Sequence, residues 1–419
     1  MSKKHFFVAL WLLVSRVLYI SKLSHYQISK LAHYQISTLA NCHISKLPHL
    51  HISTFTHLHI YTFAHYQIAV MLKYINALRL PLAALVVFIH SYNTAWRGIN
   101  SQVVDGLGTI LSRTLPTFAV PLFFAISGYL FFINQQTFSW KGYVEKLHRR
   151  FYTLLIPYIC WNVIAFALYA LKDLSAGQLL HLPLSFNLFW GCTQVGGEGA
   201  NVLGWHVMAS TAPVQEPLWF VRDLMVIVLC SPLLYAILRY LKWLGLAIVA
   251  IVYYAGLWPN VGGMTLIGVW FFMLGAWCGM NKYDVGGKLA RYWPICLVSF
   301  IISFGLLLGR GAESFVWHHV YVFSAIVTSI AIAYIVSERW PRKYKLSKAS
   351  FFIYAAHNIV LLPLTTVLAK WATYQSTFVQ SVAFMVCPFI AVAVCVIAYL
   401  LLQRFFPRTA WIVTGGKRG

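Results

Sequence analysis

The feature that most constrains this chain is a series of apolar runs, each about 17 to 25 residues long, that recurs from Leu72 to Gln403. An α-helix needs about 20 apolar residues to cross the hydrocarbon core of a bilayer, and short polar or basic connectors separate these runs. Only 10% of the 419 residues are charged, against about 25% in soluble domains. The sequence therefore predicts an all-α integral membrane protein.

The runs predict a bundle of about ten transmembrane helices. Their expected bounds are 74–93, 115–134, 151–171, 217–238, 243–258, 264–280, 292–309, 318–336, 351–369 and 380–403. If Met71 is cytoplasmic, twenty lysines and arginines fall inside and six outside. Basic residues concentrate in cytoplasmic loops. We therefore expect a multi-pass protein of a bacterial inner membrane, with both ends of the form that starts at Met71 in the cytoplasm.

The formal net charge of +23 does not indicate a nucleic-acid partner, because the basic residues gather at helix ends and not on one face of a soluble domain. Membrane lipids are the expected surroundings. The eight cysteines are scattered, mostly within apolar runs and without CxxC or metal-ligand spacing. Neither a disulfide framework nor a metal site is predicted. No HExxH, P-loop, G-x-S-x-G or Rossmann fingerprint is present either.

Residues 1–70 differ from the rest of the chain. From Ser21 to Ile68 an eight-residue unit occurs six times, and nine of the sixteen histidines lie at or before His65. A metal-binding tract is one interpretation. The other is that repetitive upstream DNA is translated from an early start codon, with Met71 as the true start. We adopt the second interpretation and expect 1–70 to be a dispensable leader, and 71–419 to be the membrane domain.

Arg79 and His90 stand eleven residues apart on the first predicted helix. Eleven residues turn a helix through slightly more than three full turns and advance it by about 16 Å, so the two side chains lie on nearly the same face. Ionisable groups inside spanning helices indicate a functional site by default. The alternative is that Arg79 reaches the inner interface and His90 the outer one.

Five segments carry a resemblance to a known family. They are RLPLAALVVFIH, PLFFAISGYLFF, KLHRRFYTLLIPY, EPLWFVRDL and KASFFIYAAHNIVLLPL. Together they resemble the membrane acyltransferase-3 family, over essentially all of the chain from Met71 onward. The resemblance implies O-acylation of extracytoplasmic carbohydrates, commonly with acetyl-CoA as donor. It also implies functional roles for an arginine and a histidine on the first helix, which match Arg79 and His90.

In that family a basic R-x-x-R pattern follows the second helix. Here Lys146-x-x-Arg149 stands in its place, followed by Arg150. Lysine and arginine are not equivalent at a bidentate anion site, because an ammonium group does not reproduce the planar fork of a guanidinium group. The resemblance nevertheless assigns Lys146, Arg149 and Arg150 to the phosphates of the donor.

Further intramembrane polar residues are candidates for acceptor binding or for supporting the site. They are Glu216, Trp219, Arg222, Asp223, Tyr354 and His357. The alternatives are an interfacial tryptophan, a local Arg222–Asp223 pair and a structural histidine bonded to a neighbouring helix. Ser127-Gly128 is compatible with close helix packing, and we assign it no chemistry.

The sequence therefore predicts an integral membrane O-acyltransferase, with His90 as general base and Arg79 beside it. Histidine suits proton transfer near neutrality because its unperturbed pKa is about 6.5. Acyl-CoA, in the first instance acetyl-CoA, is the expected co-substrate, with no tightly bound cofactor. The acceptor is an envelope glycan or a lipid-linked sugar. A transporter or flippase of envelope saccharides is the alternative, although the two halves show no inverted repeat, and a noncatalytic sensor or assembly subunit is a third.

Overall fold

The computed structural model describes residues 51–133, 138–178, 184–194, 200–202, 205–207, 211–257, 261–311, 314–340 and 345–416. The chain divides into two compact units, Met1–Met71 and Leu72–Gly419. Everything that follows concerns the second unit. The predictions made for 1–70 lie almost entirely outside the described residues, apart from the start of helix α2 (His51–Ser91), and stay predictions.

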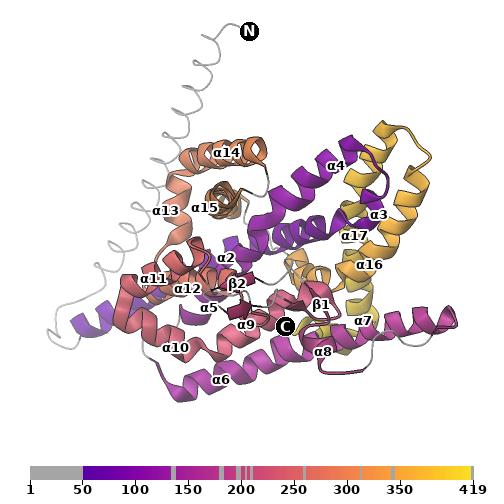
Figure 1. The fold of residues 1–419 in the computed structure, drawn as a ribbon. Coiled ribbons are helices and arrows are strands. Elements are labelled where there is room, and N and C mark those ends of the chain that lie inside the picture. Colours follow the sequence, from indigo (N-terminus) through magenta and orange to yellow (C-terminus); the bar gives the residue numbers. More distant parts are fainter. Residues whose placement is uncertain are drawn as a thin grey trace, which may run out of the picture. The chain divides into compact units, whose positions relative to one another are not determined.

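The described part of the second unit is nearly all helical (Figure 1). Eight helical segments are long and apolar enough to cross a membrane, which confirms the predicted all-α membrane class. They are Met71–Ser91, Gln102–Phe132, Trp140–Ser175, Ser231–Tyr254, Trp293–Arg310, Phe315–Arg339, Leu346–Ala372 and Thr377–Phe405. A ninth apolar helix, α12 (Leu266–Met280), is shorter. The ten predicted segments are therefore helical, but only eight helical segments in the described residues are long enough to cross a membrane.

The difference arises at the predicted helices 217–238 and 243–258. The first comprises α9 (Trp219–Leu229), α10 (Ser231–Ala236) and the π-helix η5 (Ile237–Leu241), and the second is α11 (Lys242–Tyr254). Lys242 has φ +52°, a left-handed conformation that interrupts the helix. A Cβ on Gly245 would lie 2.7 Å from Cγ2 of Ile237. The chain therefore reverses tightly at Lys242, and η5 and α11 pack as a helical hairpin. The apolar segment Ser231–Tyr254 is thus long enough to cross a membrane by length and composition, but it is not one straight helix.

Helices α5 (Ala119–Phe132) and α12 approach each other at glycines. A Cβ on Gly128 would lie 2.0 Å from the carbonyl oxygen of Phe272, and a Cβ on Gly275 would lie 1.9 Å from that of Ala125. Backbones this close leave no room for any side chain, as in small-residue contacts between membrane helices. This geometry supports the packing interpretation of Ser127-Gly128.

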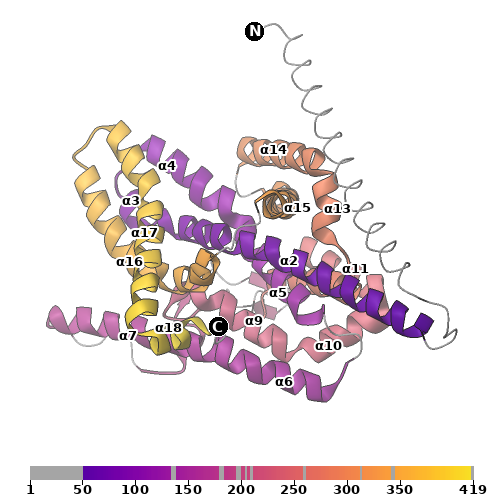
Figure 2. The ribbon, with the colours of Figure 1, turned by 180° about the vertical axis from the view of Figure 1, so that it is seen from behind.

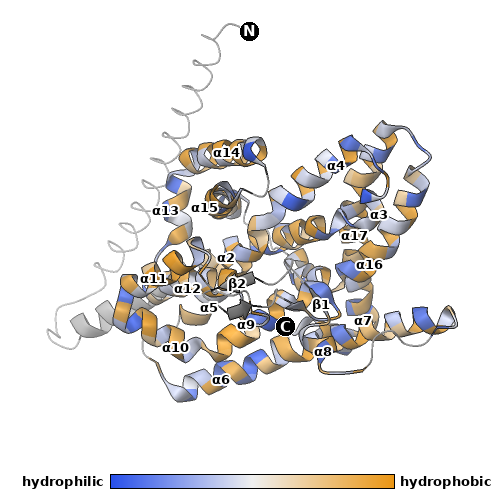
Figure 3. Ribbon diagram, in the orientation of Figure 1, coloured by the Kyte–Doolittle hydropathy of each residue, from blue (hydrophilic) through white to orange (hydrophobic). Residues whose placement is uncertain are grey.

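The remaining long helices surround this pair. They are α6 (Trp140–Arg150), α7 (Ile156–Ser175), α14 (Trp293–Arg310), α15 (Phe315–Arg339), α16 (Ser350–Ala372) and α17 (Thr377–Phe405). Helices α16 and α17 lie side by side in both ribbon views (Figures 1 and 2). Hydrophobic residues dominate most of these helices, whereas α6 alternates hydrophilic and hydrophobic positions (Figure 3). Such alternation is typical of an amphipathic helix.

The long connector predicted at 172–216 contains the few strands. In its described parts, β1 (Thr193–Gln194) pairs antiparallel with β4 (Thr211–Ala212), and β2 (Ala200–Val202) pairs antiparallel with β3 (Trp205–Val207). The short helix α8 (Asn187–Trp190) precedes them. These pairs are too short to form a sheet core.

A π-helix, η3 (Phe151–Leu155), joins α6 to α7 directly after Arg150. Pro157 has no N–H and cannot bond the carbonyl of Thr153 in the regular helical pattern. Gly415, at φ +58°, approaches that carbonyl so closely that a Cβ there would lie 2.3 Å from its oxygen. The terminal helix α18 (Pro407–Thr414) also receives a 2.9 Å hydrogen bond from Trp161 Nε1 at the Val413 carbonyl. The end of the chain thus fixes the junction that carries Arg150.

Candidate active site

The imidazole rings of His90 and His357 meet in the helix bundle. Their centroids are 5.2 Å apart with an angle of 45° between the ring planes. His90 lies one residue before the end of α2, and His357 lies in the first third of α16. His357 is 0% exposed, and His90 is partly buried. Two histidines that are 267 positions apart in the sequence therefore lie together in the structure.

The tautomer of His357 follows from its contacts. Its Nδ1 lies 2.8 Å from the carbonyl oxygen of Tyr354 and 3.2 Å from that of Ile353. A carbonyl oxygen only accepts hydrogen bonds, so Nδ1 carries the proton. In the neutral ring Nε2 then carries the lone pair. Nε2 is buried and has no hydrogen-bond partner among the residues that the structure describes.

The segment around Glu216 is tied to α16 on both sides of the glutamate. Gln215 Nε2 donates a 2.6 Å hydrogen bond to the carbonyl of Ala355. The hydroxyl of Tyr354 donates to the carbonyl of Pro217. These bonds hold the 3₁₀ turn η4 (Glu216–Leu218) against α16. The Glu216 side chain is partly buried, and its carboxylate interacts electrostatically with His90. We call His90, His357, Glu216 and Tyr354 the histidine cluster.

Arg79 and Arg150 form a second feature, which we call the arginine pair. Both side chains are partly buried, and their like charges repel each other across α2 and α6. Within the described residues, the ion pairs join Lys73 to Glu338 and Arg222 to Asp223, and neither involves this pair. Two partly buried cations without a carboxylate in ion-pair contact favour an anion.

The other two predicted donor-site cations, Lys146 and Arg149, are not part of the arginine pair, although the charge of Lys146 interacts with those of Arg150 and Arg149. Lys146 Nζ donates a 2.6 Å hydrogen bond to the backbone carbonyl of Phe131 and lies 4.6 Å from the centre of the Phe131 ring. Arg149 is exposed. The structure therefore brings Arg150, but not Arg149, to Arg79, because consecutive residues of a helix face directions about 100° apart.

Arg222 and Asp223 are engaged within the protein. Arg222 is 1% exposed and Asp223 is 0% exposed. Arg222 Nε and Nη2 donate to one oxygen of Asp223 at 3.0 and 2.9 Å, and Nη1 donates to the Trp190 carbonyl. The Asp223 carboxylate also accepts from the backbone N–H groups of Gly263 and Thr265 at 2.9 and 3.2 Å. The pair joins α9 to two connecting segments, so it has a structural role in this geometry.

Trp219 stands apart from that pair. It is partly buried, and its ring lies 6.4 Å from that of Phe124. Contact between an acceptor and Trp219 or Glu216 stays a prediction.

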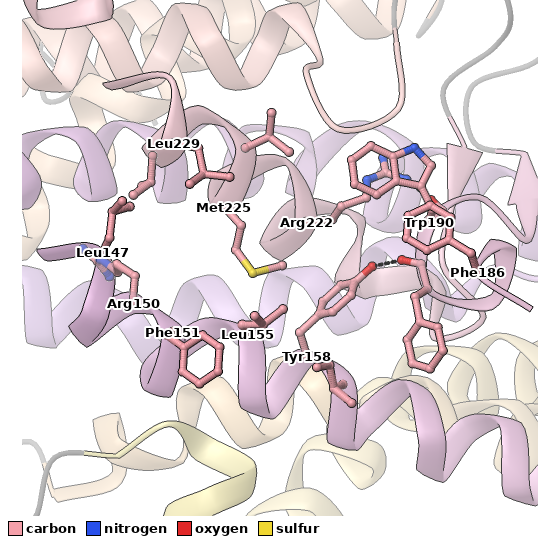
Figure 4. Close-up of a pocket in the computed structure, with 14 residues that line it drawn as sticks. Leu147, Arg150, Phe151, Leu155, Tyr158, Phe186, Trp190, Arg222, Met225 and Leu229 are labelled. Atoms are coloured by element: carbon pink, nitrogen blue, oxygen red, sulfur yellow. Dashed lines mark hydrogen bonds between the residues drawn. The ribbon is translucent and has the colours of Figure 1, made fainter. Parts of the chain in front are cut away.

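An apolar groove of about 570 Å³ runs beside α7 (Figure 4). Arg150 lies at one end, and Trp190 and Arg222 lie at the other, with Met225 between them. The hydroxyl of Tyr158, which also lines the groove, is bonded to the Phe189 carbonyl. Walls of this kind suit an alkyl chain better than a sugar.

Sequence reasoning missed some residues that hold the site together. Asn162 accepts a 3.1 Å hydrogen bond from the backbone N–H of Gln215, and its own amide donates to the carbonyl of Tyr158 at 2.8 Å. An asparagine inside an apolar run was the available signal, because intramembrane polar residues need partners. Among the described residues no group of three or more histidine, cysteine or acidic side chains could hold a metal ion.

Comparisons with known proteins agree with the resemblance seen in the sequence. The acyltransferase-3 family model, an acyltransferase domain, matches residues 72–402. The chain is also 28% identical over 366 residues to the succinoglycan biosynthesis protein ExoH of Rhizobium meliloti (strain 1021). This match covers 82% of this chain and 92% of that protein. No solved structure matches the chain. The family match includes both histidines and both members of the arginine pair, and it extends almost to the end of α17. The chain therefore belongs to the acyltransferase-3 family and is a membrane acyltransferase.

Proposed function

We propose that the protein transfers an acyl group from cytoplasmic acyl-CoA to a hydroxyl of an extracytoplasmic or lipid-linked sugar at the bacterial inner membrane. The observation that carries the proposal lies on α2, where Arg79 of the arginine pair and His90 of the histidine cluster are eleven residues apart and so share one helix face. The relative named for succinoglycan biosynthesis supports a saccharide acceptor. The acyl group is acetyl in the first instance, as the resemblance to the family implies.

The donor is bound by charge at the Arg79 end of the segment of α2 that runs from Arg79 to His90. The arginine pair takes the phosphates of acyl-CoA, because guanidinium groups form short, charge-assisted hydrogen bonds to phosphate. From Arg79 the helix advances about 16 Å to His90. The pantetheine arm of the donor spans this distance and brings the thioester to the histidine cluster. Lys146 and Arg149 add positive charge at the entrance.

The chemical step needs a base and a balanced proton path. His90 takes the proton from the acceptor hydroxyl as its oxygen attacks the thioester carbonyl. The new C–O bond forms, the C–S bond breaks, and His90 returns the proton to the departing thiolate. The Glu216 carboxylate stabilises the imidazolium in between, since a nearby negative charge favours the protonated ring. The predicted topology, with basic loops in the cytoplasm, places the arginine pair on the side where acyl-CoA is made.

The experiment is an acyl-transfer assay combined with a deletion strain. Deletion should remove acyl groups from the surface glycan while the unmodified glycan still reaches the surface. The purified protein should then transfer radiolabelled acetyl from acetyl-CoA to that glycan in detergent, where no transport can occur. Retention of the glycan inside the cell, without transfer by the purified protein, would instead support a flippase.

A further inference from the structure

His357 presents a buried nitrogen that has no hydrogen-bond partner among the described residues. Nδ1 is held by the carbonyls of Tyr354 and Ile353, and Nε2 remains an acceptor without a partner in the described residues. Leaving a buried acceptor unpaired is costly, and such atoms in native proteins call for an explanation. The centre of the His90 ring lies 5.2 Å from the centre of the His357 ring.

The spacing of the two rings suits a direct interaction. A linear N–H···N hydrogen bond of about 2.9 Å places the centres of two imidazoles roughly 5 Å apart, because each nitrogen lies just over 1 Å from its ring centre. The centroids of His90 and His357 are separated by 5.2 Å. The separation of the two rings is therefore the one that such a hydrogen bond requires.

We propose that His357 is the positioning residue of His90. Its Nε2 accepts the N–H of His90 and thereby fixes the tautomer in which the other nitrogen of His90 faces the acceptor hydroxyl. This inference rests on the proposed function. His357 keeps its own Nδ1 proton throughout, because that proton is bonded to the Tyr354 carbonyl. The reaction proton passes from the hydroxyl to His90 and then to the thiolate, and none passes to His357.

The geometry gives a reason for the two bonds that flank Glu216. Pro217 is bonded to Tyr354, and Gln215 is bonded to Ala355. The carbonyl that orients His357 belongs to Tyr354, so all three bonds come from one turn of α16. One helix turn thus positions both groups that act on His90. The Glu216 carboxylate stabilises the protonated His90 ring, and the neutral imidazole of His357 fixes the orientation of that ring.

The test uses the full-length protein, purified in detergent, in acetyl transfer to the glycan. His357→Phe keeps the ring volume but removes both nitrogens. His357→Gln places an amide near the position of Nε2, and His357→Asn places one near Nδ1 only. We expect kcat to fall at least about 10²-fold for His357→Phe and His357→Asn. We expect His357→Gln to stay within about tenfold of wild type, with the KM for acetyl-CoA little changed in all three, because the residue acts on the base and not on donor binding.

His319 supplies a matched control. It is also an intramembrane histidine whose Nδ1 lies close to a carbonyl four residues earlier, at 2.6 Å from Phe315. Its neighbours are Tyr253 and Tyr254 and not the histidine cluster. His319→Phe should leave kcat within about twofold of wild type, since it replaces one aromatic ring by another at a partly buried position and removes no group near His90.

A double variant separates positioning from an independent role. Residues that act as a unit show non-additive losses, so His90→Ala/His357→Phe should be no slower than His90→Ala. Two results would overturn the proposal. One is a loss of kcat in the double variant that equals the product of the losses in the two single variants, and the other is a kcat of His357→Phe within threefold of wild type. If His357→Phe does not fold, the order of activity between the Gln and Asn variants decides, and equal activity would overturn it. Absence of transfer by the wild-type protein would instead reject the proposed function itself.

Discussion

The Asp223 carboxylate holds the guanidinium of its chain neighbour Arg222 at 2.9 Å, in a place where both side chains are sealed from solvent. Each partner also bonds the backbone of a connecting segment, Arg222 at Trp190 and Asp223 at Gly263 and Thr265. Removing one charge therefore leaves a buried ion without its counter-ion and also releases a loop.

We predict that Asp223→Asn destabilises the protein by about 3–5 kcal/mol, the usual cost of breaking a buried ion pair. The measurement is thermal unfolding of the purified protein in detergent. The double variant Arg222→Leu/Asp223→Leu should recover part of this loss because it leaves no charge unpaired. Unchanged thermal stability of Asp223→Asn, together with a large loss of acyl transfer, would contradict the structural role and favour contact with the substrate.

The contact between α5 and α12 predicts a second stability effect. Gly275→Ala puts a Cβ within 1.9 Å of the Ala125 carbonyl oxygen, so the helices must separate. We expect a loss of about 1–3 kcal/mol, as for overpacked interiors. Gly305→Ala in α14 is the control, since a Cβ there meets nothing within 4 Å. Equal unfolding temperatures for the two variants would contradict the close packing of α5 against α12.

The arginine pair predicts a difference between neighbouring residues. Arg150→Gln should weaken acetyl-CoA binding roughly tenfold or more, because a charged hydrogen bond contributes about 1.5–3 kcal/mol. Arg149→Gln should have a much smaller effect, since Arg149 is exposed and its side chain leaves the helix about 100° away from that of Arg150. A binding titration of both purified variants provides the test. Wild-type affinity in Arg150→Gln would remove Arg150 from the donor site, and an equal loss in both variants would contradict the distinction between the two arginines.

The N-terminal region carries a prediction that stands on the sequence alone. A variant that begins at Met71 should insert into the membrane and transfer acyl groups as well as the full chain does. Membrane fractionation and the transfer assay measure both properties. Loss of either would show that 1–70 belong to the working protein.

The sequence contained most of the fold but little of the assembly of the site. Apolar run length alone predicts the spanning helices, since a bilayer core sets that length. It does not predict the reversal at Lys242, because apolar runs continue on both sides of it and only the backbone conformation marks the break.

The site shows where reading a single sequence stops. Arg79 and His90 could be placed on one face because they share a helix. Their partners Arg150 and His357 come from distant helices, and a helical pattern does not say which helices are neighbours. Asp223 was a candidate acceptor contact because intramembrane charges are functional by default. Its engagement depends on backbone N–H groups of a connecting segment at 263–265, and no pattern in the sequence indicates them.

The central claim is that His90 carries the proton transfer, and one measurement tests it most directly. Acyl transfer by purified His90→Ala should be compared with that of wild type, at equal amounts of folded protein and saturating donor. We predict a loss of about 10² to 10⁴-fold in kcat, the usual effect of removing a general base, with an unchanged elution volume in detergent. Transfer within about tenfold of wild type would contradict the account and leave the imidazole of His90 without a role in the chemical step.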